Sequence, residues 1–184
     1  MSPSGLIRST WLLYFSKPAG DRQLLKAIKG RTIRSIVEIG VGDASRIGKV
    51  LEVLGWNNQP EPIRYTGIDL FEARPTSQPR MPLKSAFQHF KETGAKFQLV
   101  PGDPYSALAR TANSLAGTDL LLIGSDQLGE SLDRAMSYLP RMIHGETLIF
   151  QEEHERTSSK HAYRKIAVDE IQKRASAMKS RRAA

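Results

Sequence analysis

Short apolar runs alternate with helical stretches along most of this chain, and this alternation limits its possible folds more than any other feature. The first run is rich in β-branched residues and ends in a glycine, and the others are of similar length. Continuous apolar runs of this length are typical of parallel strands buried on both faces of a sheet. The five runs span residues 35–40, 63–69, 95–100, 119–124 and 146–151.

Amphipathic patterns lie between these runs and predict helices over residues 21–29, 45–55, 83–93, 105–115 and 128–142. The Pro-rich residues 71–82 predict a loop. Strands that alternate with helices are joined by right-handed crossovers into a mainly parallel sheet. The sequence therefore predicts an α/β, Rossmann-like, doubly wound fold with five strands in the order 3-2-1-4-5.

Composition excludes several classes of protein. The chain has no cysteine, so it can form no disulfide, thiol nucleophile or cysteine-ligated metal site. No apolar run approaches the roughly 20 residues that a membrane-spanning helix needs. Residues 11–15 are too few for the core of a signal peptide. We therefore expect a cytoplasmic protein that does not associate with membranes.

Positive charge is concentrated at the C-terminal end. Residues 156–184 hold nine Lys or Arg and two acids, whereas residues 1–155 hold eighteen and seventeen. The apolar spacing of Tyr163, Ile166 and Ile171 predicts one helix over residues 158–180 that docks on the sheet. Its basic face is either solvated or a weak, non-specific contact for nucleic acid. We expect three parts: an N-terminal clasp (1–20), the main domain (21–155) and a basic helix with its tail (156–184).

Polar residues with chemical potential follow three successive runs. Glu38, Gly40 and Gly42 belong to the turn after the first run, where glycine permits a tight bend and close approach of a ligand. Asp69 ends the second run, where a carboxylate can accept hydrogen bonds from both hydroxyls of a ribose. Asp103 follows the third run and is either an acceptor for an adenine amine or a helix cap. The three strand ends predict one site of nucleoside size.

This arrangement resembles class I S-adenosylmethionine (AdoMet)-dependent methyltransferases, over residues 35–151. The resemblance implies AdoMet as the cofactor. It implies that Glu38, with Gly40 and Gly42, lies near the methionine amino group, that Asp69 holds the ribose and that Asp103 lies near adenine. The acid two residues before the first glycine favours this family over nicotinamide-dependent dehydrogenases.

The chain departs from the family's pattern in several places. The third glycine of the loop is missing, and the usual final pair of strands, one of them antiparallel, is not evident. In metal-dependent O-methyltransferases acids follow the fourth and fifth strands, but here Gly124 and Gln151 stand at those positions. Asp126, Glu152 and Glu153 can be read as an oxygen-rich cation site or as surface carboxylates, and we expect no metal.

The sequence does not identify the catalytic residue or the methyl acceptor. Asp126, Glu152, Glu153 and His154 are candidates for a base at the expected mouth of the site.

The first hypothesis is a methyltransferase that acts on a small molecule. The alternatives are a non-catalytic AdoMet- or nucleoside-binding module and an RNA-linked methyltransferase that uses the basic tail. The sequence does not give the oligomeric state. Residues 11–22 combine aromatic residues with Lys17, Pro18 and Arg22, and they either fold over the cofactor edge or pack their aromatic residues into a groove as a clasp, which we favour.

Overall fold

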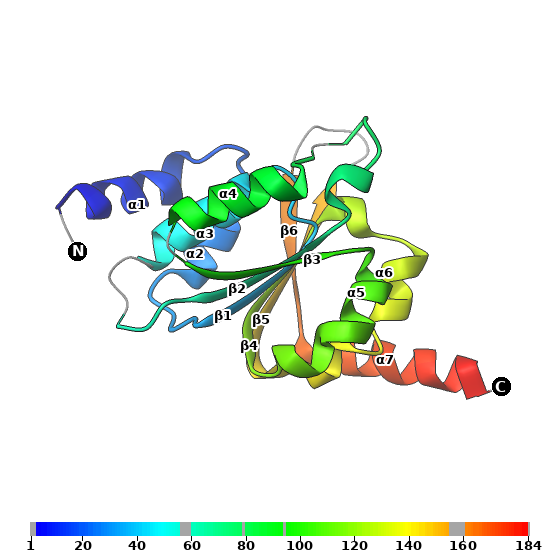
Figure 1. The fold of residues 1–184 in the computed structure, drawn as a ribbon. Coiled ribbons are helices and arrows are strands. Elements are labelled where there is room, and N and C mark those ends of the chain that lie inside the picture. The colour runs from blue at the N-terminus through cyan, green and yellow to red at the C-terminus, as the bar shows by residue number, and fades with distance from the viewer. Residues whose placement is uncertain (1–2, 56–59, 79, 94, 155–160, 184) are drawn as a thin grey trace.

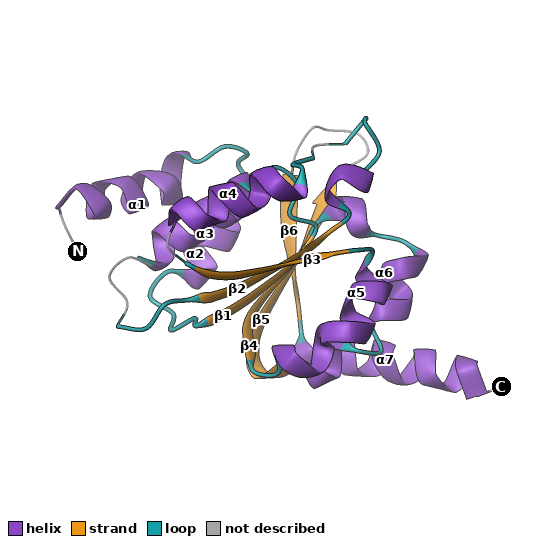
Figure 2. Cartoon of the chain, viewed as in Figure 1, coloured by secondary structure: helices purple, strands orange, loops and turns teal. Residues whose placement is uncertain are grey.

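A single sheet organises the molecule in the computed structural model, which describes residues 3–55, 60–78, 80–93, 95–154 and 161–183. Six strands lie in the order β3-β2-β1-β4-β5-β6 (Figures 1 and 2). The first five are parallel to one another, and β6 is antiparallel to β5. The strands are β1 (Ser35–Ile39), β2 (Arg64–Asp69), β3 (Lys96–Pro101), β4 (Thr118–Ile123), β5 (Ile143–His154) and β6 (His161–Ile166).

Helices cover both faces of this sheet. In Figure 1, α1 to α4 lie on one side of the strands and α5 to α7 on the other. The α-helices are α1 (Pro3–Phe15), α2 (Asp21–Ile28), α3 (Ser45–Leu54), α4 (Leu83–Thr93), α5 (Pro104–Thr111), α6 (Glu130–Ala135) and α7 (Val168–Ala183). Short 3-10 helices are η2 (Phe71–Ala73), η3 (Ala112–Leu115), η4 (Ser125–Gln127) and η5 (Leu139–Arg141).

Alternation of side chains along each strand creates two apolar cores. Ile36 of β1 belongs to the core under α2 and α3, and its neighbour Val37 belongs to the core under α5 and α6. The same division separates Leu120 from Leu121 in β4. Because both faces are covered, both sets of side chains are buried, which explains the continuous apolar runs in the sequence. The predicted order of the first five strands is confirmed.

The C-terminal part corrects two predictions. The sheet has a sixth strand, β6, so the antiparallel strand that was not evident in the sequence is present. The single helix predicted over 158–180 is wrong, since residues 161–166 form this strand and α7 begins at Val168. Tyr163 and Ile166 are three residues apart, as on a helix, but they point to opposite faces of the strand and enter different cores. Residues 155–160 lie outside the described part.

The N-terminal segment is a helix, and its aromatic residues do not pack as a clasp. Leu12 and Leu13 are buried, whereas Trp11, Tyr14 and Phe15 are each more than half exposed. The aliphatic residues of α1, rather than the aromatic ones, attach it to α2 and α3. Among the described helices, none combines the length and the apolar character needed to cross a membrane.

Candidate functional site

A cavity of about 460 Å³ opens at the carboxyl edge of the sheet. It lies where β1 stands between β2 and β4, so that connections leave β1 and β4 toward opposite faces. Ligands of doubly wound folds bind at this position, and the volume lies within the usual range for small-molecule sites. Its walls come from the start of α2 and the loop before it, the turn after β1, the start of α3, the loop after β2, η4 and strands β5 and β6. The charged side chains in its lining are Asp21, Asp43, Arg46, Arg74, Asp126 and Glu152.

The turn after β1 is held open by two glycines. Gly40 has a φ of +92°, and a Cβ atom there would lie 2.7 Å from Cγ of Gln127. Gly42 has a φ of +62° and faces open space, since a Cβ atom there would have no atom within 4 Å outside its own turn. Gly40 is therefore required by packing as well as by backbone conformation, while Gly42 leaves a bare backbone in the cavity wall.

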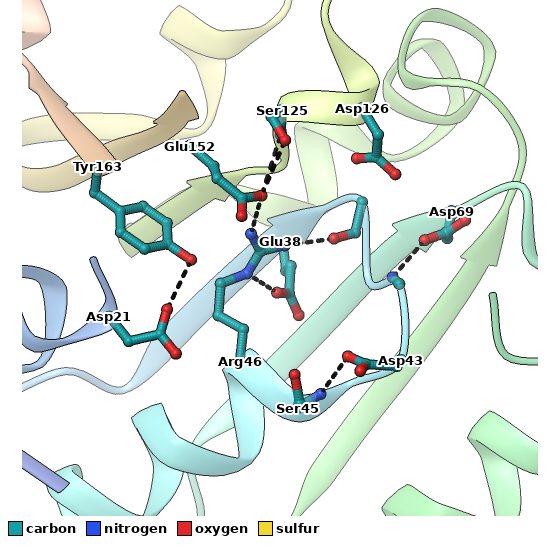
Figure 3. A network of polar contacts seen from close by, with 12 residues as sticks. Asp21, Glu38, Asp43, Ser45, Arg46, Asp69, Ser125, Asp126, Glu152 and Tyr163 are labelled. Carbon is teal, nitrogen blue, oxygen red and sulfur yellow. Dashed lines mark hydrogen bonds and ion pairs between the residues drawn. The ribbon is translucent and has the colours of Figure 1, made fainter. Parts of the chain in front are cut away.

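Arg46 gathers the polar groups at one end of this cavity (Figure 3). Its Nε donates to Oε1 of Glu38 at 2.6 Å, and its Nη1 donates to Oε2 of Glu152 at 3.0 Å. Its Nη2 donates to the carbonyl oxygen of Gly40 at 2.5 Å. Arg46 stands in the first turn of α3, and helical side chains lean toward the helix N-terminus. This geometry carries its guanidinium back over the end of β1.

Glu38 lies beneath the cavity wall rather than in it. Its side chain is fully buried, and its second carboxylate oxygen accepts a hydrogen bond from the hydroxyl of Tyr65 at 2.6 Å. Burial raises the pKa of Glu38 above its ordinary value, although Arg46 and Tyr65 counteract part of this effect. In this arrangement Glu38 reaches the cavity through Arg46, and its contact with a cofactor stays a prediction.

Asp69 ends β2 and is held by an arginine of its own. Arg74 binds both of its carboxylate oxygens, through Nε to Oδ1 and through Nη2 to Oδ2 at 2.6 Å. The same guanidinium binds Asp126 through Nη1. Burial alone would raise the pKa of Asp69, but the hydrogen bonds from Arg74 and from the amide of Gly42 outweigh it and lower the pKa.

Asp103 caps helix α5, which was one of its two predicted roles. Its Oδ1 accepts hydrogen bonds from the backbone amides of Tyr105 at 3.0 Å and Ser106 at 3.3 Å. The hydroxyls of Ser106 and Ser131 also donate to this carboxylate, and together these bonds lower the pKa of Asp103 to about 2. Asp103 is not among the residues that line the cavity, and its contact with adenine stays a prediction.

Asp21, Lys49 and Tyr163 form a second set of hydrogen-bonded side chains at the cavity wall, near Arg46. Asp21 of α2 accepts a hydrogen bond from Nζ of Lys49 at 2.6 Å and one from the hydroxyl of Tyr163 at 3.3 Å. Figure 3 shows Tyr163 and Asp21 facing each other, with Glu152 beside Tyr163 on the neighbouring strand. Burial raises the pKa of Tyr163 well above its ordinary value, so its hydroxyl keeps its proton at neutral pH.

Two of the four candidate catalytic residues line the cavity. Asp126 and Glu152 line the cavity, and Glu152 also accepts hydrogen bonds from the amide and hydroxyl of Ser125. Glu153 is exposed and binds Arg164 of β6 instead. His154 is the last residue of β5, and its side chain is outside the described part. Within the described residues no three His, Asp or Glu side chains are grouped as metal ligands.

Neither arginine of the site was predicted from the sequence. Their positions offered a signal, because Arg46 lies in the first helical turn after the glycine turn and Arg74 lies five residues after Asp69. Either position allows a long cationic side chain to reach an acid at a strand end. Asp21 and Tyr163 were missed for another reason, since nothing in the local pattern predicts that α2 and β6 meet at this edge.

The sequence matches no known family model, and it matches no curated protein. Its structure is similar to solved methyltransferases. A precorrin-6y C5,15-methyltransferase from Geobacter metallireducens is 17% identical with a TM-score of 0.51, over 74% of this chain and 63% of that protein. This chain therefore spans less than two thirds of that protein's length.

Two further structures cover more of both chains. A TehB-like SAM-dependent methyltransferase from Corynebacterium glutamicum is 16% identical with a TM-score of 0.50, over 95% of this chain and 80% of that one. A candidate caffeoyl-CoA O-methyltransferase from Staphylococcus aureus is 11% identical with a TM-score of 0.54, over 97% and 82%. This chain therefore has the Rossmann-like fold of the class I AdoMet-dependent methyltransferases.

Proposed function

We propose that this protein binds AdoMet in the cavity beside β1 and transfers its methyl group to a small molecule. The observation that carries the proposal is the position of the cavity, at the glycine turn after β1 in a fold shared with AdoMet-dependent methyltransferases. The bare backbone at Gly42 leaves room for a ligand against this turn. The volume of about 460 Å³ suits a nucleoside with an amino-acid side arm.

The charge of the cavity supports a cationic cofactor. Four carboxylates line it against two guanidiniums, so its wall is negative although the whole chain carries +8. A negative pocket raises the local concentration of cations. AdoMet supplies a methyl group on a positively charged sulfur, and its sulfonium and ammonium groups outnumber its one carboxylate. The residues of the cavity therefore fit this cofactor in charge as well as in size.

The residues at the cavity wall suggest how the methyl acceptor is positioned and deprotonated. Methyl transfer needs the acceptor's lone pair in line with the reactive carbon, so positioning is the main task of the protein. Glu152, held by Arg46 and Ser125, presents a fixed carboxylate that can orient an acceptor hydroxyl or take its proton. The hydroxyl of Tyr163 already donates its proton to Asp21, so its lone pairs can accept a hydrogen bond from an acceptor hydroxyl or amine. Asp126 is another of the four carboxylates in the cavity wall.

Parallel calorimetric titrations with AdoMet, S-adenosylhomocysteine and NAD test the proposal. We expect the first two to bind and NAD not to bind. As a residue test, Asp69→Ala removes the predicted contact with the ribose and should weaken AdoMet binding by about 1.5–3 kcal/mol, roughly ten- to hundredfold. Glu61→Ala, at an exposed position near the opposite end of β2, is the control and should leave the affinity unchanged. Binding of NAD in place of AdoMet would refute the cofactor.

Transfer is tested separately from binding. A non-catalytic module would bind AdoMet but transfer no methyl group, so radiolabelled AdoMet should be incubated with panels of phenols, amines, carboxylates and RNA. We expect label on a small molecule. Label on RNA would favour the RNA-linked alternative. Binding without transfer to any class would favour the non-catalytic module.

A further inference from the structure

The carboxylate of Asp69 has no hydrogen-bonding capacity left for a ribose. An ionised carboxylate offers about four lone-pair sites. Oδ1 accepts from the amide of Phe71 at 3.0 Å and from Nε of Arg74. Oδ2 accepts from the amide of Gly42 at 2.9 Å and from Nη2 of Arg74 at 2.6 Å. Two of these four donors belong to the backbone of the turns, and the other two belong to one long side chain with several rotatable bonds.

Arg74 is placed between this acid and the cavity. Its side chain is 1% exposed, yet it belongs to the cavity lining, as does Asp126, which it also binds. Asp69 itself is 1% exposed and is absent from the lining. The guanidinium therefore closes the route from the cavity to Asp69 and spans from the end of β2 to the segment after β4.

The backbone before Arg74 is built to return this side chain to Asp69. Phe71 has a φ of +49°, an uncommon conformation for a bulky residue, and its ring is buried. The amide of Arg74 donates to the carbonyl oxygen of Phe71 at 3.1 Å, which closes the short turn η2. The buried ring of Phe71 anchors this turn although Glu72 and Ala73 are exposed, so the side chain of Arg74 can swing while the backbone at Phe71 stays in place.

We propose that Arg74 is a displaceable block on the ribose subsite and sets the affinity of this protein for adenosine compounds. The inference rests on the proposed function, since it takes Asp69 as the ribose acceptor. Ribose hydroxyls reach Asp69 only when the guanidinium gives up its two bonds there. Arg74 then keeps its bond to Asp126 at the other side of the cavity. The apparent affinity is the intrinsic affinity multiplied by the fraction of molecules in which Arg74 has left the subsite.

Titration of adenosine into the parent and Arg74→Ala tests this block. Adenosine is neutral, so its affinity reports access to Asp69 rather than the added negative charge that Arg74→Ala leaves in the cavity. We expect Arg74→Ala to bind adenosine roughly three- to thirtyfold more tightly than the parent, because the competing charged hydrogen bonds are gone. Arg80→Ala, an exposed arginine of the same loop, is the matched control and should leave the affinity unchanged.

Two milder variants allow the same measurement if Arg74→Ala does not fold. Asp126→Asn keeps Arg74 and weakens a bond that Arg74 makes both when it blocks Asp69 and when it leaves, so we expect little change in adenosine affinity. Arg74→Lys keeps the charge but cannot donate two parallel hydrogen bonds to Asp69, and we expect an intermediate gain. Melting curves of each variant confirm that the affinities are compared between folded proteins.

The outcomes separate this inference from the proposed function. Parent protein that binds AdoMet, together with Arg74 variants of equal or weaker affinity for adenosine, would overturn the block and leave the function standing. Parent and variants that all fail to bind AdoMet and adenosine would overturn both. Tighter binding in Arg74→Ala and Arg74→Lys, abolished when Asp69→Ala is added, would establish that Arg74 competes with the ribose for Asp69.

Discussion

The guanidinium of Arg46 and the carboxylate of Glu38 form a buried ion pair, with 2.6 Å between Nε and Oε1. Glu38 is fully buried and the side chain of Arg46 is 12% exposed. The pair joins the end of β1 to the first turn of α3, on either side of the glycine turn. A buried carboxylate is tolerated when it is paired and hydrogen-bonded, so the shape of this turn depends on Arg46.

Loss of Arg46 should therefore destabilise the protein strongly. Arg46→Ala leaves Glu38 buried with Tyr65 as its remaining side-chain donor, and we expect a loss of about 3–5 kcal/mol in the free energy of unfolding. Urea denaturation measures this value. Burial raises the folded-state pKa of Glu38 above its ordinary value of 4.5, so the folded state binds this proton more readily than the unfolded chain. Arg46 lowers this pKa, so its loss raises the pKa further, and the deficit should be full at high pH and shrink as the pH falls toward 4.5.

A double variant provides the control for this pair. Glu38→Gln combined with Arg46→Ala removes the unpaired charge, and it should recover part of the stability that Arg46→Ala loses. The recovered stability should depend little on pH. If the double variant were no more stable than Arg46→Ala, the buried charge of Glu38 would not be the cause of the loss.

The two glycines of the turn should differ in their tolerance of a side chain. Gly42→Ala places a Cβ in open space at a φ of +62°, so the cost is backbone strain of about 1–2 kcal/mol. Gly40→Ala adds a contact at 2.7 Å with Gln127 to strain at a φ of +92°, and we expect a loss of about 2–5 kcal/mol. Urea denaturation of both variants compares them directly. Equal losses would show that Gln127 moves aside without cost.

Asp103 should contribute to stability as a helix cap. Asp103→Ala removes the acceptor for two backbone amides of α5 and should cost about 1 kcal/mol, whereas Asp103→Ser keeps a capping oxygen and should cost less. The folded-state pKa of about 2 lies below the ordinary value of 3.8, so the ionised cap stabilises the fold above that value. This contribution is lost as the pH falls from 3.8 toward 2, and the curves for parent and Asp103→Ala should converge there. AdoMet affinity distinguishes the two predicted roles of Asp103. If Asp103 only caps α5, Asp103→Ser should leave the affinity unchanged; if it also accepts a hydrogen bond from adenine, Asp103→Ser should weaken it.

The last six residues of the basic C-terminal end should be separable from the cavity. Helix α7 packs beside β5 and η5, and none of its described residues lines the cavity. Removal of residues 179–184 should leave AdoMet affinity unchanged in calorimetry. Loss of AdoMet binding on this truncation would mean that the tail completes the site.

Nucleic acid should bind this end weakly and without sequence preference. Part of its charge is already engaged within the chain, since Glu170 binds both Arg164 and Arg174. Filter binding to several RNA sequences should therefore fall steeply between about 50 and 200 mM salt, because counterion release drives such contacts. Removal of residues 179–184, which takes away three of the Lys and Arg residues and leaves β6 in place, should weaken it. Tight binding that survives about 200 mM salt and distinguishes sequences would support the RNA-linked alternative.

The sequence by itself determined the five parallel strands and the edge of the sheet where the cavity lies. Apolar runs predicted β1 to β5 and their order, because a parallel sheet buried on both faces imposes that pattern wherever it occurs. The glycines after β1, with the acids at strand ends, indicated the edge where the cavity lies, since parallel strands end at one edge.

Tertiary structure alone decided β6 and the partners of the acids. Tyr163 and Ile166 have helical spacing, and only pairing with β5 and burial against two different cores make their segment a strand. Likewise, local pattern could not show that Arg46 would join Glu38 to Glu152, which are separated by more than a hundred residues. A long side chain reaches any acid within several ångströms, so its partner depends on which strand ends the fold brings together. That is why the sequence located the site but could not show how its charges are paired.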